Sequence, residues 1–306
     1  MHRFSFFFLV VILSTTTVLS AQHKTPWGDP DLQGIWSNQS PTPLERPDAL
    51  AGKQSLTEEE AAEFEKTSLE RLLTTFAREV PISGELNEIW LETAKGRVPP
   101  GRSTSLVVDP PDGKIPYTPE GRKRWDAVPK IGAPLLANAP EDRTLAERCI
   151  TTDGLLVPNP FYNNYFRIVQ APGYVAILYE MIHETRVIPL DGREPVGKGI
   201  RQDMGDARGR WEGDTLVVTT KNFKDRSAYR NANAETLTLT ERFQRIAPDQ
   251  VRWAVTVDDP STWTKPWTFS LPLTADPNPL PLYECHEGNY GLKNILSAAR
   301  AEEREQ

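Results

Sequence analysis

Histidine and carboxylate side chains are the groups of this 306-residue chain best suited to proton transfer near neutral pH. The chain has four histidines, and His183 and His286 are the two that lie beyond its N-terminal region. Glu287 follows His286 directly in a polar run, and Asp258 ends a run of alternating apolar residues. We take these four residues as candidate catalytic groups. The alternative, that each histidine is an ordinary structural residue, stays open at this point.

A metal ion would need three or four ligands held together. The four candidates could supply them only if the fold gathers them, and the chain has no CxxC pair and no HExxH motif. We therefore predict no metal and no cofactor.

Two predicted strands carry charged side chains on faces that are otherwise apolar. Glu241 interrupts an apolar alternation in residues 236–246, and Arg186 shares one face of residues 174–190 with Glu180. Burying such groups unpaired costs roughly 1–3 kcal/mol or more. Arg186 should therefore pair with Glu241 or Glu180, or else these groups line a polar interior that binds a small ligand. The candidate ligand-binding residues are Glu241, Arg186, Tyr179, Trp253 and Trp267.

The first 21 residues have the pattern of a signal peptide. A basic start at residues 1–3 precedes an apolar run over 4–13, and small residues surround Ser20 and Ala21. The apolar run is too short to span a bilayer comfortably. We predict cleavage after Ser20 or Ala21, export to the periplasm or the exterior, and no stable membrane insertion afterwards.

Export changes the interpretation of the two cysteines. Cys149 and Cys285 are far apart in sequence, and in an oxidising compartment two such thiols more often form a disulfide. The alternative is a pair of separate buried thiols.

Composition limits the remaining classes of function. A formal charge of −7 argues against a nucleic-acid partner, and no repeat indicates a solenoid. The expected partner is a small molecule, and nothing in the sequence indicates an oligomeric state.

The positioning elements are mostly β-strands. Residues 161–290 contain about eight runs rich in Val, Ile, Thr, Trp and Tyr, separated by turn residues with no helical pattern between them. This pattern predicts a mainly β fold, an antiparallel up-and-down barrel or strongly curled sheet. The predicted strands are 166–170, 174–190, 208–212, 215–220, 236–246, 251–258, 265–273 and 282–285.

The flanking segments differ from this domain. Residues 22–160 are irregular and rich in proline, which should forbid continuous helix between Pro99 and Pro140 and leave the segment to wrap the barrel. One amphipathic helix over about 57–78 should begin at a capping box formed by Thr57 and Glu60. A short helix should occupy the C-terminal part, 291–306, with a tail that frays after Ala301.

Four motifs carry a resemblance over nearly the whole mature chain: PWGDPDLQGIW (26–36), RGRWEGDTLVVTT (208–220), DDPSTWTKPW (258–267) and CHEGNYG (285–291). With them the chain resembles a large family of exported bacterial proteins. The resemblance implies a lipocalin-like (calycin-type) β domain behind an irregular N-terminal segment, and it implies no catalytic residue.

Three classes of function follow. The leading hypothesis is an exported lipocalin-like protein that takes a small apolar or aromatic molecule into its barrel. The first alternative is a barrel hydrolase, lyase or isomerase that uses histidine and carboxylate groups. The second is a structural or interaction protein of the cell envelope. A polar cavity that contains both histidines would favour the enzyme. An apolar cavity without them would favour the lipocalin-like binder, and a filled barrel would favour the structural or interaction protein.

Overall fold

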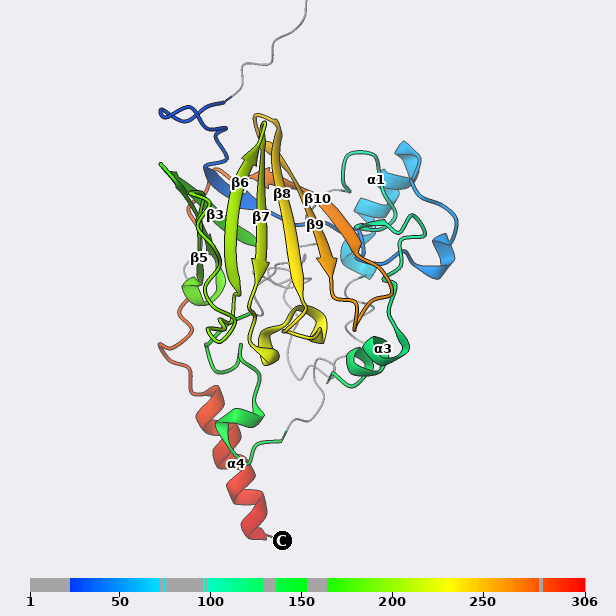
Figure 1. Cartoon of the computed structure of the whole chain (residues 1–306). Coiled ribbons are helices and arrows are strands. Elements are labelled where there is room, and N and C mark those ends of the chain that lie inside the picture. Colours follow the sequence, from blue (N-terminus) through cyan, green and yellow to red (C-terminus); the bar gives the residue numbers. More distant parts are fainter. Residues whose placement is uncertain are drawn as a thin grey trace, which may run out of the picture.

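The computed structural model describes residues 23–71, 74, 96, 98–128, 136–152, 164–280 and 283–305. The predicted signal peptide and its cleavage site lie outside these residues. Within them, strands with alternating buried and exposed side chains form one antiparallel sheet (Figure 1). The strands are β1 (Gly34–Ser37), β2 (Val107–Asp109), β3 (Tyr165–Ala171), β4 (Tyr174–Tyr179), β5 (Thr185–Pro189), β6 (Asp206–Glu212), β7 (Thr215–Lys221), β8 (Thr238–Ala247), β9 (Gln250–Asp258) and β10 (Trp267–Ala275).

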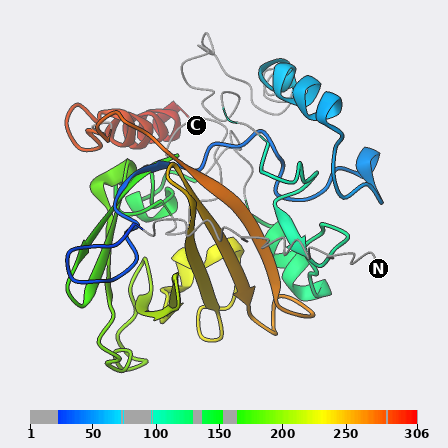
Figure 2. The same ribbon diagram turned by 90° about the horizontal axis from the view of Figure 1, so that it is seen from above.

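The sheet curls into a nearly closed barrel, which confirms the predicted fold class. Its strand order is β5-β4-β3-β1-β10-β9-β8-β7-β6, and β2 pairs with β10 beside this path. The two end strands, β5 and β6, lie against each other without a hydrogen-bonded ladder between them in the described part of the chain. A Cβ added at Gly209 of β6 would lie 2.6 Å from the side chain of Leu190 and 2.8 Å from that of Ile188. Glycine therefore permits the close approach that brings the two ends together (Figures 1 and 2).

Two predicted strands are wrong in detail. Residues 174–190 are not one strand, because a short 3-10 turn, η5 (Met181–His183), separates β4 from β5, and Ile182 adopts a φ of 61° there. No strand forms over 283–285, which are irregular, while 281 and 282 lie outside the described residues. The charged residues between 180 and 186 therefore do not share one continuous strand face.

The N-terminal region contributes more regular structure than expected. β1 lies between β3 and β10, and Trp36 on it is 1% exposed. Helix α3 (Pro119–Asp126) forms inside the proline-rich stretch, where continuous helix was predicted to be impossible. The reason is that Pro119 occupies the first helical turn, where a missing N–H costs nothing, and Thr118 caps the amide of Gly121.

Helix α1 (Glu58–Lys66) begins with the predicted capping box. Glu60 N donates to Thr57 Oγ1 at 3.2 Å, and Thr57 N donates to Glu60 Oε2 at 2.8 Å. The helix ends at Lys66, and residues 72–73 and 75–95, which contain much of the predicted extension to 78, lie outside the described residues. Both α1 and α3 lie on the β10 side of the barrel (Figures 1 and 2).

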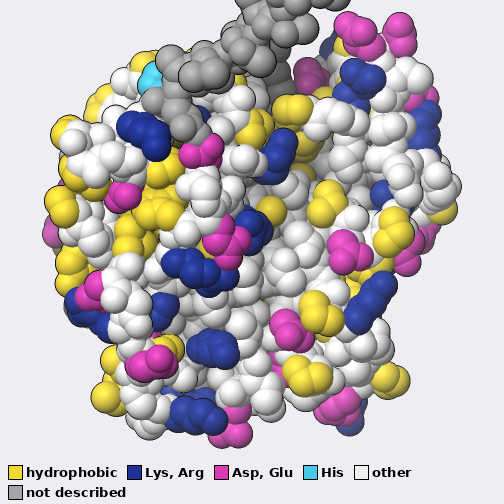
Figure 3. All heavy atoms as spheres, turned by 45° about the horizontal axis from the view of Figure 1, so that its top comes forward, with side chains coloured by type: hydrophobic (Ala, Val, Ile, Leu, Met, Phe, Trp, Pro, Cys, Tyr) yellow, Lys and Arg dark blue, Asp and Glu magenta, His cyan; other side chains and the backbone are white. Residues whose placement is uncertain are grey.

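The C-terminal helix α4 (Gly291–Glu305) has no buried residue and extends away from the barrel (Figure 1). The predicted fraying after Ala301 is wrong, because the helix continues through the charged residues and an Arg300–Glu303 ion pair lies along it. No helix among the described residues is long and apolar enough to span a membrane. Figure 3 shows one face of the molecule, on which acidic and basic side chains are interspersed.

Candidate functional site

An ion pair inside the barrel is the centre of the candidate site. Arg186 of β5 and Glu241 of β8 meet in a two-pronged arrangement, with Nη1–Oε1 at 3.1 Å and Nη2–Oε2 at 2.5 Å. Their side chains are 4% and 1% exposed. This confirms one of the two predicted pairings. The other predicted partner, Glu180, instead accepts hydrogen bonds from the backbone amides of Asn164 and Tyr165.

Two hydroxyl groups complete the cluster around Arg186. Its Nη1 donates to the Tyr179 hydroxyl at 3.1 Å, and its Nη2 donates to Thr220 Oγ1 at 3.0 Å. Burial alone would lower the pKa of Arg186, but the charge of Glu241, the neighbouring Tyr179 and the hydrogen bonds to both residues together outweigh burial and raise that pKa. Burial also raises the pKa of Tyr179, so its phenol stays neutral. This cluster thus contains one compensated charge pair and two hydroxyl groups.

Aromatic rings connect this cluster to the rest of the interior. Phe166 contacts Tyr179 with ring centroids 6.2 Å apart and Trp253 with centroids 6.4 Å apart. Trp253 stacks on Phe243 and meets Phe269 edge-on at 5.7 Å.

The series of contacting aromatic rings continues from Phe269 to Trp267 and Tyr229. Phe269 lies 6.0 Å from Trp267, and Trp267 stacks on Tyr229 of the 3-10 turn η7 (Tyr229–Asn231). The structure therefore places all five ligand-binding candidates in the interior, three in direct contact and the two tryptophans along the rings. That they bind a ligand remains a prediction.

The catalytic candidates are not gathered in the same way. His286 and Glu287 are exposed on the segment before α4, and Asp258 is exposed at the end of β9. The turn between β9 and β10 lies on the opposite side of the barrel from the start of α4 (Figures 1 and 2). Asp258 therefore does not join the other candidates in one site.

His183 lies in η5, and its side chain is outside what the structure describes. The segments that carry the two histidines nonetheless contribute to one depression of about 450 Å³, which is lined by Met181 of η5 and by Glu287. Hydrogen bonding to its own backbone amide lowers the pKa of Glu287, and His286 adds to this effect. The proposed meeting of the two imidazoles stays a prediction.

Asp259, not its neighbour Asp258, is the carboxylate that organises this part of the chain. It is fully buried and accepts hydrogen bonds from Thr236 Oγ1 at 2.6 Å, Ser261 N at 3.0 Å and Asn233 N at 2.9 Å. Thr262 and Ser261 donate their hydroxyls to it as well. The Asp-Pro-Ser-Thr sequence, typical of a turn closed by an aspartate side chain, was the signal that sequence reasoning missed. Its role is to hold the β9–β10 turn against the segment before β8.

Asp259→Asn should lower the free energy of unfolding at pH 7 by about 2 kcal/mol, because an amide NH₂ would face donors. Burial alone would raise the pKa of Asp259, but these hydrogen bonds outweigh burial and lower it below 3.8. Its contribution is therefore complete above about pH 5 and lost as the pH falls through the lowered pKa. Urea unfolding from pH 7 to pH 2.5 should show the difference between variant and wild type shrinking with acid. A constant difference would contradict this, and Asp258→Asn is the matched control.

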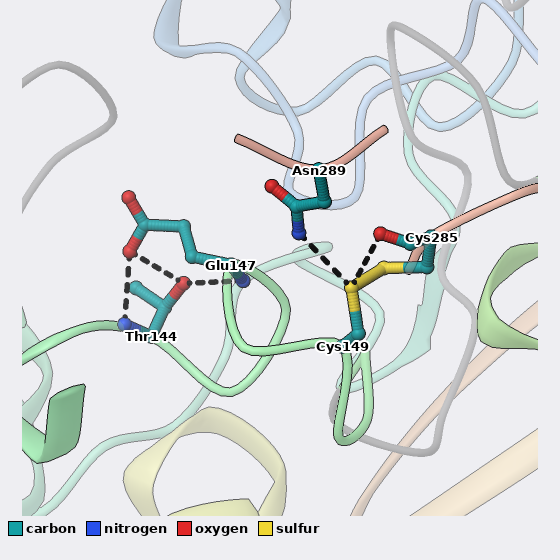
Figure 4. The surroundings of a disulfide bond; sticks show 5 residues. All are labelled: Thr144, Glu147, Cys149, Cys285 and Asn289. Carbon is teal, nitrogen blue, oxygen red and sulfur yellow. Dashed lines mark hydrogen bonds between the residues drawn. A yellow bond between two sulfur atoms is a disulfide. The ribbon is translucent and has the colours of Figure 1, made fainter. Parts of the chain in front are cut away.

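The predicted disulfide is present. Cys149 and Cys285 are joined, with their Cα atoms 5.8 Å apart (Figure 4). Asn289 Nδ2 donates to the Cys149 sulfur at 3.4 Å. The Cys285 carbonyl oxygen lies 3.0 Å from the same sulfur, which is a contact and not a hydrogen bond because that sulfur carries no hydrogen. The bridge ties the segment before the barrel to the segment that leads into α4.

A larger cleft of about 630 Å³ lies outside the barrel, between the α1 region and the β8–β9 turn. Glu65, Arg102, Asp249 and Asp276 contribute charged groups of both signs to it. The described residues contain no group of three or more His, Cys, Asp or Glu side chains placed to hold a metal ion.

Comparison with known proteins adds no assignment. The chain matches no family model, no curated protein and no solved structure. Inference about function therefore depends on the geometry of the barrel itself.

Proposed function

We propose that this protein is an exported, lipocalin-like barrel that holds a small apolar or aromatic molecule in its interior. The observation that carries the proposal is the buried Arg186–Glu241 pair with Tyr179 and Thr220, set among aromatic rings. Sites for small molecules are mostly apolar and aromatic with a few placed polar groups, which is the composition found here. Export is part of the proposal, supported by the N-terminal pattern, by the resemblance to exported bacterial proteins and by a disulfide suited to an oxidising compartment.

A purely structural core would have little use for this cluster. Hydrophobic residues of similar volume commonly replace a buried ion pair with no loss of stability, or with a gain. A function that needs polar groups in the interior explains their presence better. The barrel enzyme has less support, because His286, Glu287 and Asp258 are exposed. Asp258 is the last residue of β9, and the turn that follows β9 lies on the opposite side of the barrel from the start of α4 (Figures 1 and 2).

The interaction protein keeps one observation in its favour, namely a core with several fully buried aromatic side chains. Large side chains such as Trp36, Trp267, Phe243 and Phe269 are fully buried. A binding experiment separates the two classes.

The test uses the full chain expressed with its own N-terminal segment and purified from the periplasm. Native mass spectrometry should show a co-purified small molecule, and the neutral fluorescent probe N-phenyl-1-naphthylamine should bind and raise the melting temperature further as its concentration increases. Tyr179→Phe should change the affinity for this probe at least about fivefold, because one buried hydrogen-bonding group is lost. Tyr174→Phe, on the exposed face of the same strand, should leave it unchanged.

Absence of both a co-purified molecule and probe binding would favour the interaction protein. Equal effects of the two tyrosine variants would place the probe outside the barrel and contradict the proposal.

A further inference from the structure

Several hydrogen-bond donors buried among the described residues have no acceptor. In the described part of the chain, Trp253 Nε1, Trp267 Nε1 and Arg186 Nε are buried and have no hydrogen-bond partner, and the Tyr229 hydroxyl has no acceptor for its proton. These four residues are between 0% and 7% exposed. Indole and guanidinium nitrogens can only donate, and burial raises the pKa of Tyr229 so that its hydroxyl keeps its proton.

The acceptors of the polar cluster are already used by Arg186. Both carboxylate oxygens of Glu241 accept from its terminal nitrogens, and the hydroxyl oxygens of Tyr179 and Thr220 accept from them too. None of these contacts serves Arg186 Nε or a tryptophan. Trp263 Nε1 is a fifth unpartnered donor, and its ring lies 5.9 Å from that of Trp267. Buried donors without acceptors are rare in native proteins and each one is unfavourable, so five of them in one connected set of side chains need an explanation.

The unpartnered donors belong to that one connected set. Trp253 and Trp267 both contact Phe269, at 5.7 Å and 6.0 Å between ring centroids, and Tyr229 stacks on Trp267 at 6.3 Å. Arg186 joins the set through Tyr179, whose ring contacts Phe166 beside Trp253. An acceptor group bound among these rings would therefore have several unpartnered donors in its surroundings.

Charge then restricts the kind of acceptor. Glu241 already neutralises Arg186, so a carboxylate held against these donors would remain a buried charge without a counter-ion. A neutral carbonyl oxygen accepts the same hydrogen bonds without that penalty. The ring lining suits a flat, apolar skeleton.

We infer that the molecule held in the barrel is a neutral carbonyl compound, a ketone, ester, lactone or amide on an aromatic or alicyclic skeleton, whose oxygen accepts from Trp253 or its neighbours. This inference rests on the proposed function and names the class of ligand. The ligand class can be tested separately from the proposed function by comparing ligands that differ only in their acceptor group.

The experiment compares three naphthalene probes of matched shape by calorimetric titration of the full chain. 2-Acetylnaphthalene offers a neutral acceptor, 2-ethylnaphthalene offers none, and 2-naphthoate offers a charged one. The ketone should bind about tenfold more tightly than the ethyl compound and more tightly than the naphthoate. It should also shift the indole N–H resonance of Trp253 or Trp267 in ¹⁵N spectra.

Trp253→Phe keeps an aromatic ring and removes the donor, so the affinity for the ketone should fall toward the affinity for the ethyl compound. Trp27→Phe is the matched control, because Trp27 is exposed and its Nε1 already donates to Asp29. The wild-type series decides the matter even where a variant fails to fold.

Equal affinities for ketone and ethyl compound would overturn the ligand class and leave the proposed function standing. Tightest binding of the naphthoate would overturn the neutral acceptor. Binding of none of the three would count against the class and the proposed function together.

Discussion

Replacing Glu241 by leucine should lower the free energy of unfolding by about 3–5 kcal/mol, since it leaves Arg186 as a buried charge without a counter-ion. Both side chains are almost completely buried, so solvent cannot compensate. For a domain of this size the melting temperature should fall by roughly 10 °C. Urea unfolding followed by tryptophan emission and circular dichroism measures the change.

Two controls make this result specific to the buried pair. The double variant Arg186→Met with Glu241→Leu should recover most of the loss, because it removes both charges. Glu212→Gln breaks exposed ion pairs with Arg210 and Arg242, and it should change the free energy of unfolding far less than Glu241→Leu because solvent screens these pairs. A double variant as unstable as the single one would mean that the packing of Glu241, and not its charge, carries the effect.

Removing the disulfide should have an effect of similar size. Cys149 and Cys285 are separated by 136 residues in sequence, and closing a loop of that length restricts the unfolded chain by about 5 kcal/mol in the entropic account. The double variant Cys149→Ser with Cys285→Ser should therefore unfold at a clearly lower urea concentration. Its free energy of unfolding should fall by about 4–5 kcal/mol at most.

Reduced wild-type protein should match the double variant, and adding reductant to the double variant should change nothing. Since α4 has no buried residue, the segment around His286 should also become sensitive to protease once the bridge is lost. Unchanged stability after complete reduction would show that the unfolded chain is not restricted by this loop.

The fold is predictable from the sequence where strands are long and have two distinct faces. The predicted bounds of β6, β7, β8, β9 and β10 agree with the structure to within about two residues at most ends, because alternation over seven or more residues is a strong signal. β1 and β2 have four and three residues and no measurable period, so the pattern does not reveal them. The turn η5 escapes prediction because apolar residues continue through Ile182, and only its left-handed backbone breaks the strand.

The site is partly predictable for the same reason. A single charge on an apolar face must find a partner, and this requirement alone predicts that Arg186 pairs with Glu241 or Glu180. The expected meeting of His183 and His286 depends on the first and last predicted strands being neighbours. In the barrel β1 separates β3 from β10, the ends that approach are β5 and β6, and residues 283–285 form no strand. Asp259 is easily overlooked because one position along the chain separates an exposed carboxylate from a buried one.

The contact between β5 and β6 has a consequence for behaviour at high concentration. A sheet that curls without a final ladder retains two edge strands, and such edges are templates for pairing with other chains. Here the chain after β5 lies along β6: Val196 N donates to Asp206, and the Arg208 guanidinium donates to the carbonyl of Glu194. This loop therefore covers part of β6, the last strand of the sheet. Shortening residues 194–203 should promote self-association into β-rich aggregates well before it affects the aromatic core.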